Sequence, residues 1–184
     1  MKGIGEVADF ANGYTFLSSS FRDGGRYKVI TIANVQQGHM ISANANTIER
    51  LPDNIQKNQI LNIGDILISM TGNVGRVCMV NEENCLLNQR VGKIIPREIN
   101  KEYLYHMISL PQFTSRMVAS GQGGAQDNLS SKDILNYVVS VPSRDEQMKI
   151  AAFIGSIAQS IYTEELRLAN YRDWKKSLLQ RMFV

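Results

Sequence analysis

Two cysteines and two histidines are the residues of this 184-residue chain best suited to metal binding or nucleophilic catalysis. Six residues separate Cys78 from Cys85, and His39 and His106 are isolated in the sequence. Zinc sites usually need closer pairs and more ligands, and no ordering of serine, histidine and aspartate suggests a triad. We therefore predict two buried structural thiols and no metal site.

Phosphate-binding loops are also missing from the sequence. No segment matches the G-x-x-x-x-G-K-[ST] loop of motor proteins. The segments "GNVGRV" (72–77) and "GQGGAQ" (121–126) contain glycines but lack the G-x-G-x-x-G spacing of a dinucleotide site. We interpret both segments as turns.

Short strands must position the loops of residues 1–142. The strand candidates are rich in β-branched residues and bounded by Gly, Asn or Pro. They are residues 27–35, 63–72, 75–80, 86–96 and 138–142. The candidates 63–72 and 75–80 predict a hairpin. Gly38 predicts a turn after the first candidate, and Pro96 predicts the end of a strand. The expected core comprises Val29, Ile30, Ile32, Ile66, Leu67, Ile68, Val77 and Ile94.

Helices are expected between the last two strand candidates. Asn100 is a suitable cap for residues 100–120, and Pro111 divides that segment into two helices. Residues 129–137 favour one helical turn capped by Ser130 or Ser131. Together these elements predict an α+β fold for a globular domain over residues 1–142.

The composition is that of an ordinary soluble protein, with 43% hydrophobic and 20% charged residues and a net charge of +3. No apolar run approaches the ~20 residues needed to span a bilayer. No signal peptide is suggested at the start, so a cytoplasmic location is expected. Because the charge is so small, nucleic-acid binding would require arginines gathered on one face.

A single long helix is predicted for residues 143–184, where Ser143 and Glu146 match a capping box. Its seam residues recur at alternating steps of four and three, which is typical of a coiled coil. They are Ile150, Ile154, Ile157, Ile161, Glu164, Leu168, Tyr171, Lys175, Leu178 and Met182. A helix lying on its own domain is the alternative, but so long and narrow a seam favours a long partner.

Glu164 and Lys175 are the two polar positions of the seam. In an antiparallel pair of identical helices, Glu164 of one copy can face Lys175 of the other. The same alignment pairs the apolar seam residues Leu168 and Tyr171, Ile161 and Leu178, and Ile157 and Met182. We hypothesise a homodimer whose register is fixed by these opposite charges.

Six segments, in order, resemble one repeat of a type I restriction–modification specificity subunit. They are "IGEVADFANGYTF", "VITIANVQQGHM", "IGDILISMTGNVGRVCMV", "LNQRVGKIIP", "NLSSKDILNYVVSVPSRDEQMKIAAFI" and "KKSLLQRMFV". The resemblance covers nearly the whole chain. Family members usually carry two repeats and this chain carries one, so we expect a half-length subunit acting as a dimer, or a fragment of a longer subunit.

The resemblance implies that the domain reads one half of a split target in double-stranded DNA. The long helices would pair antiparallel, set the half-site spacing and dock modification subunits, which transfer methyl groups from S-adenosylmethionine to adenine. Restriction subunits would join to cut. The chain itself would bind no cofactor and catalyse nothing, and it lacks the Asn/Asp-Pro-Pro-aromatic motif of adenine methyltransferases. A fragment of a fused methyltransferase–nuclease and a protein-binding assembly module are the alternatives.

The resemblance also directs attention to loop side chains with paired donors and acceptors. Those expected to contact DNA are Ser18, Ser19, Arg22, Arg26, Tyr27 and Lys28 in a first loop, Thr71, Asn73 and Arg76 at a hairpin tip, Gln89 and Arg90 before a strand, and Gln122, Gln126 and Asn128 in a Gly-rich loop. Each residue can instead belong to a solvated loop. For Arg76 and Arg90, structural salt bridges are an equal alternative.

Overall fold

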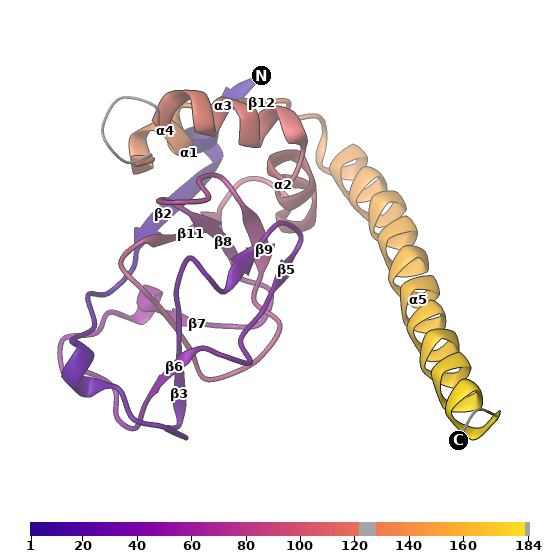
Figure 1. Ribbon diagram of the computed structural model, residues 1–184. Coiled ribbons are helices and arrows are strands. Elements are labelled where there is room, and N and C mark those ends of the chain that lie inside the picture. Colours follow the sequence, from indigo (N-terminus) through magenta and orange to yellow (C-terminus); the bar gives the residue numbers. More distant parts are fainter. Residues whose placement is uncertain (122–127, 183–184) are drawn as a thin grey trace.

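Short strands form two four-stranded sheets in the first part of the chain (Figure 1). The computed structural model describes residues 1–121 and 128–182. The first sheet is antiparallel and consists, in spatial order, of β2 (Ala8–Asn12), β11 (Val91–Pro96), β8 (Ile66–Ser69) and β9 (Val77–Met79). The second consists of β6 (Asn46–Ile48), β3 (Tyr27–Ile30), β10 (Cys85–Leu87) and β7 (Ile60–Leu61), with β3 and β10 parallel.

Two short ladders and the helices complete the fold. The ladders join β1 (Lys2–Gly3) to β12 (Val138–Val139), and β4 (Val35–Gln36) to β5 (His39–Met40). The helices are α1 (Ile4–Val7), α2 (Lys101–Ile108), α3 (Pro111–Gly121), α4 (Ser131–Leu135) and α5 (Arg144–Met182), with 3-10 turns η1 (Ser18–Ser20) and η2 (Lys57–Gln59). None of the helices in the described ranges is long and apolar enough to cross a membrane.

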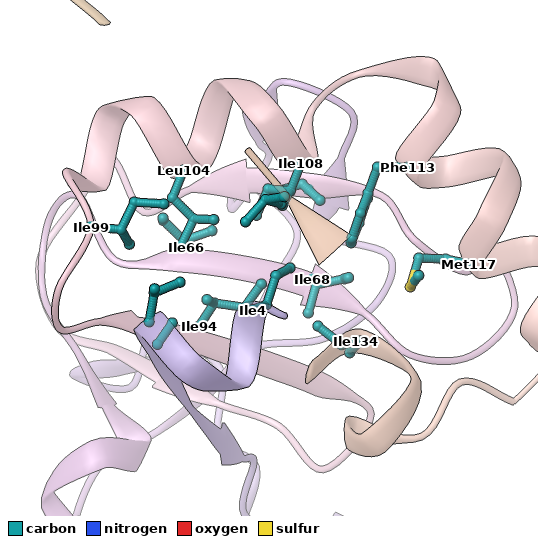
Figure 2. Packing of buried hydrophobic residues seen from close by; sticks show 14 of the residues in the cluster. Ile4, Ile66, Ile68, Ile94, Ile99, Leu104, Ile108, Phe113, Met117 and Ile134 are labelled. Carbon is teal, nitrogen blue, oxygen red and sulfur yellow. The ribbon is translucent and has the colours of Figure 1, made fainter. Parts of the chain in front are cut away.

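The main core lies between the first sheet and the short helices (Figure 2). Ile66 and Ile68 of β8 pack there with Leu104 and Ile108 of α2, because alternate strand residues share a face. Leu67 points to the other face and joins a second cluster with residues of both sheets. The predicted core residues are buried except Ile32, which is partly exposed.

The predicted strand over residues 27–35 is wrong beyond Ile30. Asn34, only 6% exposed, turns the chain there. Its Oδ1 accepts hydrogen bonds from the N–H and the hydroxyl of Thr31, each at 2.8 Å, and its Nδ2 donates to the Ile41 carbonyl at 2.8 Å. The segment therefore divides into β3 and β4.

The predicted strand over residues 86–96 is wrong at Asn88–Arg90. There the Val91 N–H donates to the Asn88 carbonyl at 2.9 Å, and the chain passes from β10 in one sheet to β11 in the other. The strand expected over 138–142 is shortened to β12. Other local predictions are confirmed: the hairpin of β8 and β9, the caps Asn100 and Ser130, and the start of a second helix at Pro111.

The long helix α5 projects away from the domain (Figure 1). The exposed fraction along its seam is 37% at Ile154, 54% at Ile161 and 71% at Met182. The alternative in which the helix lies on its own domain is therefore excluded. An apolar seam of this length remains to be covered by something else.

Gln147 fastens the start of α5 to the domain. Its side chain is buried, with Oε1 accepting from the Asn100 N–H at 2.8 Å and Nε2 donating to the Pro142 carbonyl at 2.9 Å. Ala151 is 7% exposed in the main core, and Ile150 packs against it. This junction fixes the direction in which the helix leaves.

Replacing Gln147 by Ala should lower the free energy of unfolding by about 2 kcal/mol, because two backbone groups lose their partners in a buried junction. Urea denaturation of the variant measures the loss. The matched control is Gln159→Ala, at an exposed position of the same helix. Equal stability of the two variants would show that the junction does not depend on the Gln147 amide.

Candidate nucleic-acid interface

Strand pairing gathers several polar loops at one edge of the first sheet. In β11, Gly92 pairs with Asn12 of β2, and Val91 pairs with Ser69 of β8. The residues that follow β2, precede β11 and follow β8 therefore lie together. We call the resulting surface the loop edge; it comprises residues 13–15, 53–59, 70–73, 88–90 and Asn128.

Hydrogen bonds tie the parts of the loop edge to one another. The Tyr14 carbonyl accepts from the Gln89 N–H at 2.9 Å, and the Thr15 hydroxyl donates to the Gln89 side chain at 2.9 Å. The Met70 N–H donates to the Arg90 carbonyl at 3.0 Å. Thr71 forms an isolated antiparallel bridge with Asn128. Four segments distant in sequence are thus held in one arrangement.

Gly13 permits the closest of these approaches. A Cβ atom at this position would stand 1.9 Å from the Asn88 carbonyl oxygen. Any side chain would therefore push the segment after β2 away from Asn88–Arg90. The rigidity of the loop edge depends on this missing side chain.

The predicted residues of the loop edge differ in how free their side chains are. Asn73, Gln89, Arg90 and Asn128 are exposed, and Arg90 makes no ion pair within the described residues. Thr71 is partly buried, and its hydroxyl has no partner in the described part of the chain. Gln122 and Gln126 lie outside the described residues.

Two of the predicted residues, Arg22 and Lys28, line a polar hollow beside the second sheet. The hollow has a volume of about 670 Å³ and is lined by residues 21–24, Lys28 and residues 42–47. The Arg22 N–H donates to the Thr47 carbonyl at 2.8 Å, and this bond joins two walls of the hollow. Lys28 lies at the start of β3, whereas Gln89 follows the end of the parallel strand β10. The hollow and the loop edge are therefore separate.

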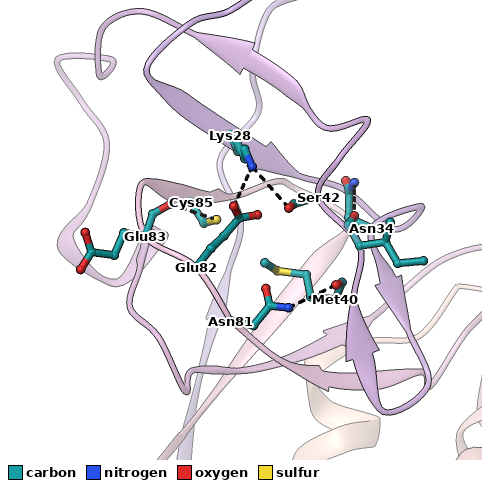
Figure 3. Close-up of polar contacts among 9 residues, drawn as sticks. Lys28, Asn34, Met40, Ser42, Asn81, Glu82, Glu83 and Cys85 are labelled. Atoms are coloured by element: carbon teal, nitrogen blue, oxygen red, sulfur yellow. Dashed lines mark hydrogen bonds and ion pairs between the residues drawn. The ribbon is translucent and has the colours of Figure 1, made fainter. Parts of the chain in front are cut away.

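Several predicted cations are held by contacts within the domain. Lys28 forms an ion pair with Glu82 at 2.6 Å beside the Ser42 hydroxyl (Figure 3). The Arg22 guanidinium donates to backbone carbonyls of its own loop, at 2.7 Å to Phe21 and 3.0 Å to Ser19. Arg76 donates to the Gln36 side chain at 2.6 Å. All three side chains therefore take part in contacts within the domain.

The remaining residues of the first loop are more exposed. Ser18 and Ser19 form part of η1 with their side chains in solvent. Arg26 stands over the ring of Tyr27, 5.4 Å from its centroid. Neither residue of this pair lines the hollow or belongs to the loop edge.

A family model described as the type I restriction modification DNA specificity domain matches residues 1–170. The chain belongs to this family. It is 29% identical over 167 residues to the type I restriction enzyme EcoBI specificity subunit of Escherichia coli, with 88% of this chain and 33% of that protein covered. It is 25% identical over 190 residues to the type I restriction enzyme MjaVIII specificity subunit of Methanocaldococcus jannaschii, with 97% of this chain and 44% of that protein covered. This specificity domain thus spans less than half the length of these relatives.

Solved structures confirm the α+β fold with its long terminal helix. The HsdS subunit from Thermoanaerobacter tengcongensis superposes with a TM-score of 0.64 at 22% identity, over 88% of this chain and 37% of that one. A second solved chain comes from a structure described as the basis of complex assembly and conformational transition of the type I R-M system. It superposes with a TM-score of 0.68 at 20% identity, over 88% of this chain and 38% of that one.

The specificity domain also presents polar residues that the sequence did not single out. The Tyr14 hydroxyl donates to Asn54 at 2.7 Å, and the Gln59 amide donates to the Asn12 carbonyl at 3.2 Å. These contacts bring the segment 53–59, with exposed Lys57, to the loop edge. Its run "DNIQKNQ" of amides between two strand candidates is the signal that could have identified it. Asn44 and Asn46 of "SANANT" similarly line the hollow.

The cysteines of the specificity domain are buried free thiols, as predicted. Burial raises the pKa of Cys78 to about 12. Burial and the Glu82 charge raise the pKa of Cys85 to about 11, against an opposing effect of Lys28. Burial also lowers the pKa of His106. Within residues 1–121 and 128–182, no three His, Cys, Asp or Glu residues gather as a metal site would require.

Both thiols should remain unmodified by a thiol reagent at pH 8 in the folded protein, because the reactive species is the thiolate. The raised pKa values predict labelling at least about a hundredfold slower than after unfolding in urea. A Ser115→Cys variant, exposed on α3, supplies the rapidly labelled control. Rapid labelling of native Cys78 or Cys85 would contradict the burial described above.

Proposed function

We propose that this chain reads one half of a split DNA target through its loop edge, and that α5 pairs with an antiparallel helix to hold two such readers at a fixed distance. The observation that carries the proposal is the family match over residues 1–170, which spans both the domain and most of α5. The chain itself catalyses nothing in this proposal. Methylation and cleavage would belong to modification and restriction subunits that assemble on it.

The chemistry of the loop edge supports its role as the reader. Gln and Asn side chains offer a donor and an acceptor to one base, and Arg donates two hydrogen bonds to guanine. Gln89, Asn73 and Asn128 supply the amides, and Arg90 supplies the guanidinium. Because backbone hydrogen bonds and Gly13 hold these loops, their side chains can be presented in one geometry. Lys57 adds a cation suited to a phosphate.

The exposed seam of α5 supports its role as the spacer. Isolated apolar residues on a surface need no explanation, but a heptad seam exposed over most of a 39-residue helix requires a partner of similar length. A second copy of this chain supplies such a seam. S-adenosylmethionine would bind to the modification subunits rather than to this chain.

Arg90→Ala should weaken binding to the target duplex about tenfold to a hundredfold in the complex with the modification subunits, because a bidentate base contact contributes that much discrimination. The target is first defined by mapping methylated adenines, and affinity is then measured by fluorescence anisotropy. Arg97→Ala is the matched control, since Arg97 follows the opposite end of β11 and pairs with Asp9.

Equal losses in the two arginine variants would contradict a reader at the loop edge. The affinity of the unaltered complex should also fall steeply as salt is raised, because phosphate contacts release counterions. Binding that does not change with salt would favour the assembly-module alternative, in which the domain contacts protein.

Glu164→Lys should dissociate a dimer of this chain, because it places two lysines in the pairing seam of α5. Sedimentation of the purified chain measures the change in mass. Adding Lys175→Glu should restore the dimer, since the two charges are then exchanged. Failure of the double variant to dimerise would contradict the alignment of Glu164 with Lys175.

A further inference from the structure

We infer that charges flanking the seam of α5 select one antiparallel register for two copies of this chain, and so determine the gap between the half-sites they read. The inference rests on the helix pairing proposed above. It adds a set of spacing-determining residues: Glu164, Glu165, Arg167, Arg172 and Lys175, with Trp174.

These side chains are free to meet a second helix. The Glu164 and Arg167 side chains are 67% and 59% exposed, and their contact at 2.9 Å lies within one helix. Trp174 is 64% exposed. Glu165, Arg172 and Lys175 are also exposed. Within the described residues, the domain of the same chain leaves this stretch of α5 uncovered.

The seam charges disfavour a parallel pair. In a parallel pair in register, each seam residue meets its own copy. Glu164 would then face Glu164, and Lys175 would face Lys175. The antiparallel pair instead places Glu164 of each copy against Lys175 of the other.

The residues beside the seam favour this same register. In an antiparallel pair, residues that flank one side of the seam lie beside their equivalents in the second helix. The same holds for residues that flank the other side. When Glu164 faces Lys175, Glu165 lies beside Arg172 of the second copy. On the other side, Arg167 lies beside Trp174, an arrangement suited to a cation–π contact. Two-fold symmetry forms each contact twice.

In a competing register, one helix slides by one heptad along the other, so that the two helices overlap more fully. All ten seam positions of one copy would then meet seam positions of the other. Burial of apolar area alone would favour it. At its two-fold axis, however, Glu165 would face Glu165, and Arg167 would face Arg167. Glu164 and Lys175 would meet apolar residues, which leaves both charges without partners in a buried seam.

The junction of α5 with the domain also opposes fuller overlap. That register brings Met182 of the second copy to Ile150, which already packs against its own core beside Ala151. The extra burial is correspondingly small. In the charge-matched register, Met182 lies opposite Ile157, which is 44% exposed and does not belong to the core of the domain.

The choice of register has a direct consequence for DNA. One heptad corresponds to about 10 Å of helix. Because stacked base pairs are about 3.4 Å apart, the two registers would separate the half-sites by lengths that differ by about three base pairs. The charges near the middle of α5 would therefore act on target choice without touching DNA.

Site-directed disulfides can test the register. Chains carrying Tyr171→Cys are mixed with chains carrying either Leu168→Cys or Ile161→Cys and then oxidised. The charge-matched register places position 171 opposite position 168, and the fuller overlap places it opposite position 161. Crosslinked dimers are quantified on a non-reducing gel, and the buried Cys78 and Cys85 contribute no background.

We expect the Leu168→Cys pair to crosslink and the Ile161→Cys pair to remain largely uncrosslinked. Neutralising four charges, with Glu164→Leu, Glu165→Gln, Arg167→Gln and Lys175→Leu, should shift crosslinking to the Ile161→Cys pair. A variant with Asp173→Asn and Lys176→Gln, on the side of α5 away from the seam, should leave the unaltered pattern.

Crosslinking of the Ile161→Cys pair in the protein with its native charges would overturn the inference, while the proposed helix pairing would stand. The same conclusion would follow if neutralisation left the pattern unchanged. A chain that sediments as a monomer and gives neither crosslink would overturn both the inference and the proposed pairing. DNA reading by the loop edge is measured separately.

Discussion

The attachment of α5 at Gln147 is the constraint on which the rest of the arrangement depends. The side chain bonds to backbone groups on both sides of the junction, at Asn100 and at Pro142. Beyond Ala151 the helix has no buried residue in its described part. A helix held only at one end has a defined direction relative to its domain if that end is rigid. The buried Gln147 amide, with both of its polar atoms hydrogen-bonded, makes the attachment rigid. A loose junction would make the spacing between two domains indefinite, whatever the register of the paired helices.

The second constraint is the passage of the chain from one sheet to the other at Asn88–Arg90. β10 pairs in parallel with β3, and β11 pairs antiparallel with β2 and β8, so the turn between them is shared by both sheets. This position explains why Gln89 and Arg90 are at once exposed and firmly held. Side chains that recognise a ligand benefit from such placement, because little conformational entropy remains to be lost on binding.

The sequence predicted the elements whose causes are local. The seam of α5, the Asn100 cap and the break at Pro111 depend on residues a few positions apart. The turn at Asn34 could not be foreseen, because it depends on a side chain that reaches Ile41 in the next segment. The loop edge was equally hidden, since Tyr14 meets Gln89 only once β2 has paired with β11. Residue type alone also could not show which cations make contacts within the domain. Arg90 makes no ion pair in the described ranges, whereas Lys28 contacts Glu82 and Arg76 contacts Gln36.

If the chain functions as proposed, the separation of the loop edge from α5 would allow reading and spacing to vary independently. Loop side chains such as Gln89 contribute little to the core, so their replacement would alter base contacts and leave the junction at Gln147 intact. Changes in the seam would alter the pairing of α5 and leave the loops intact, because the seam is exposed on a helix that projects away from the domain (Figure 1). A split target has two such properties, the bases of each half and the length between the halves. In the proposed function they belong to two parts of the chain, which are joined through the small, buried contact at Gln147 and Ala151.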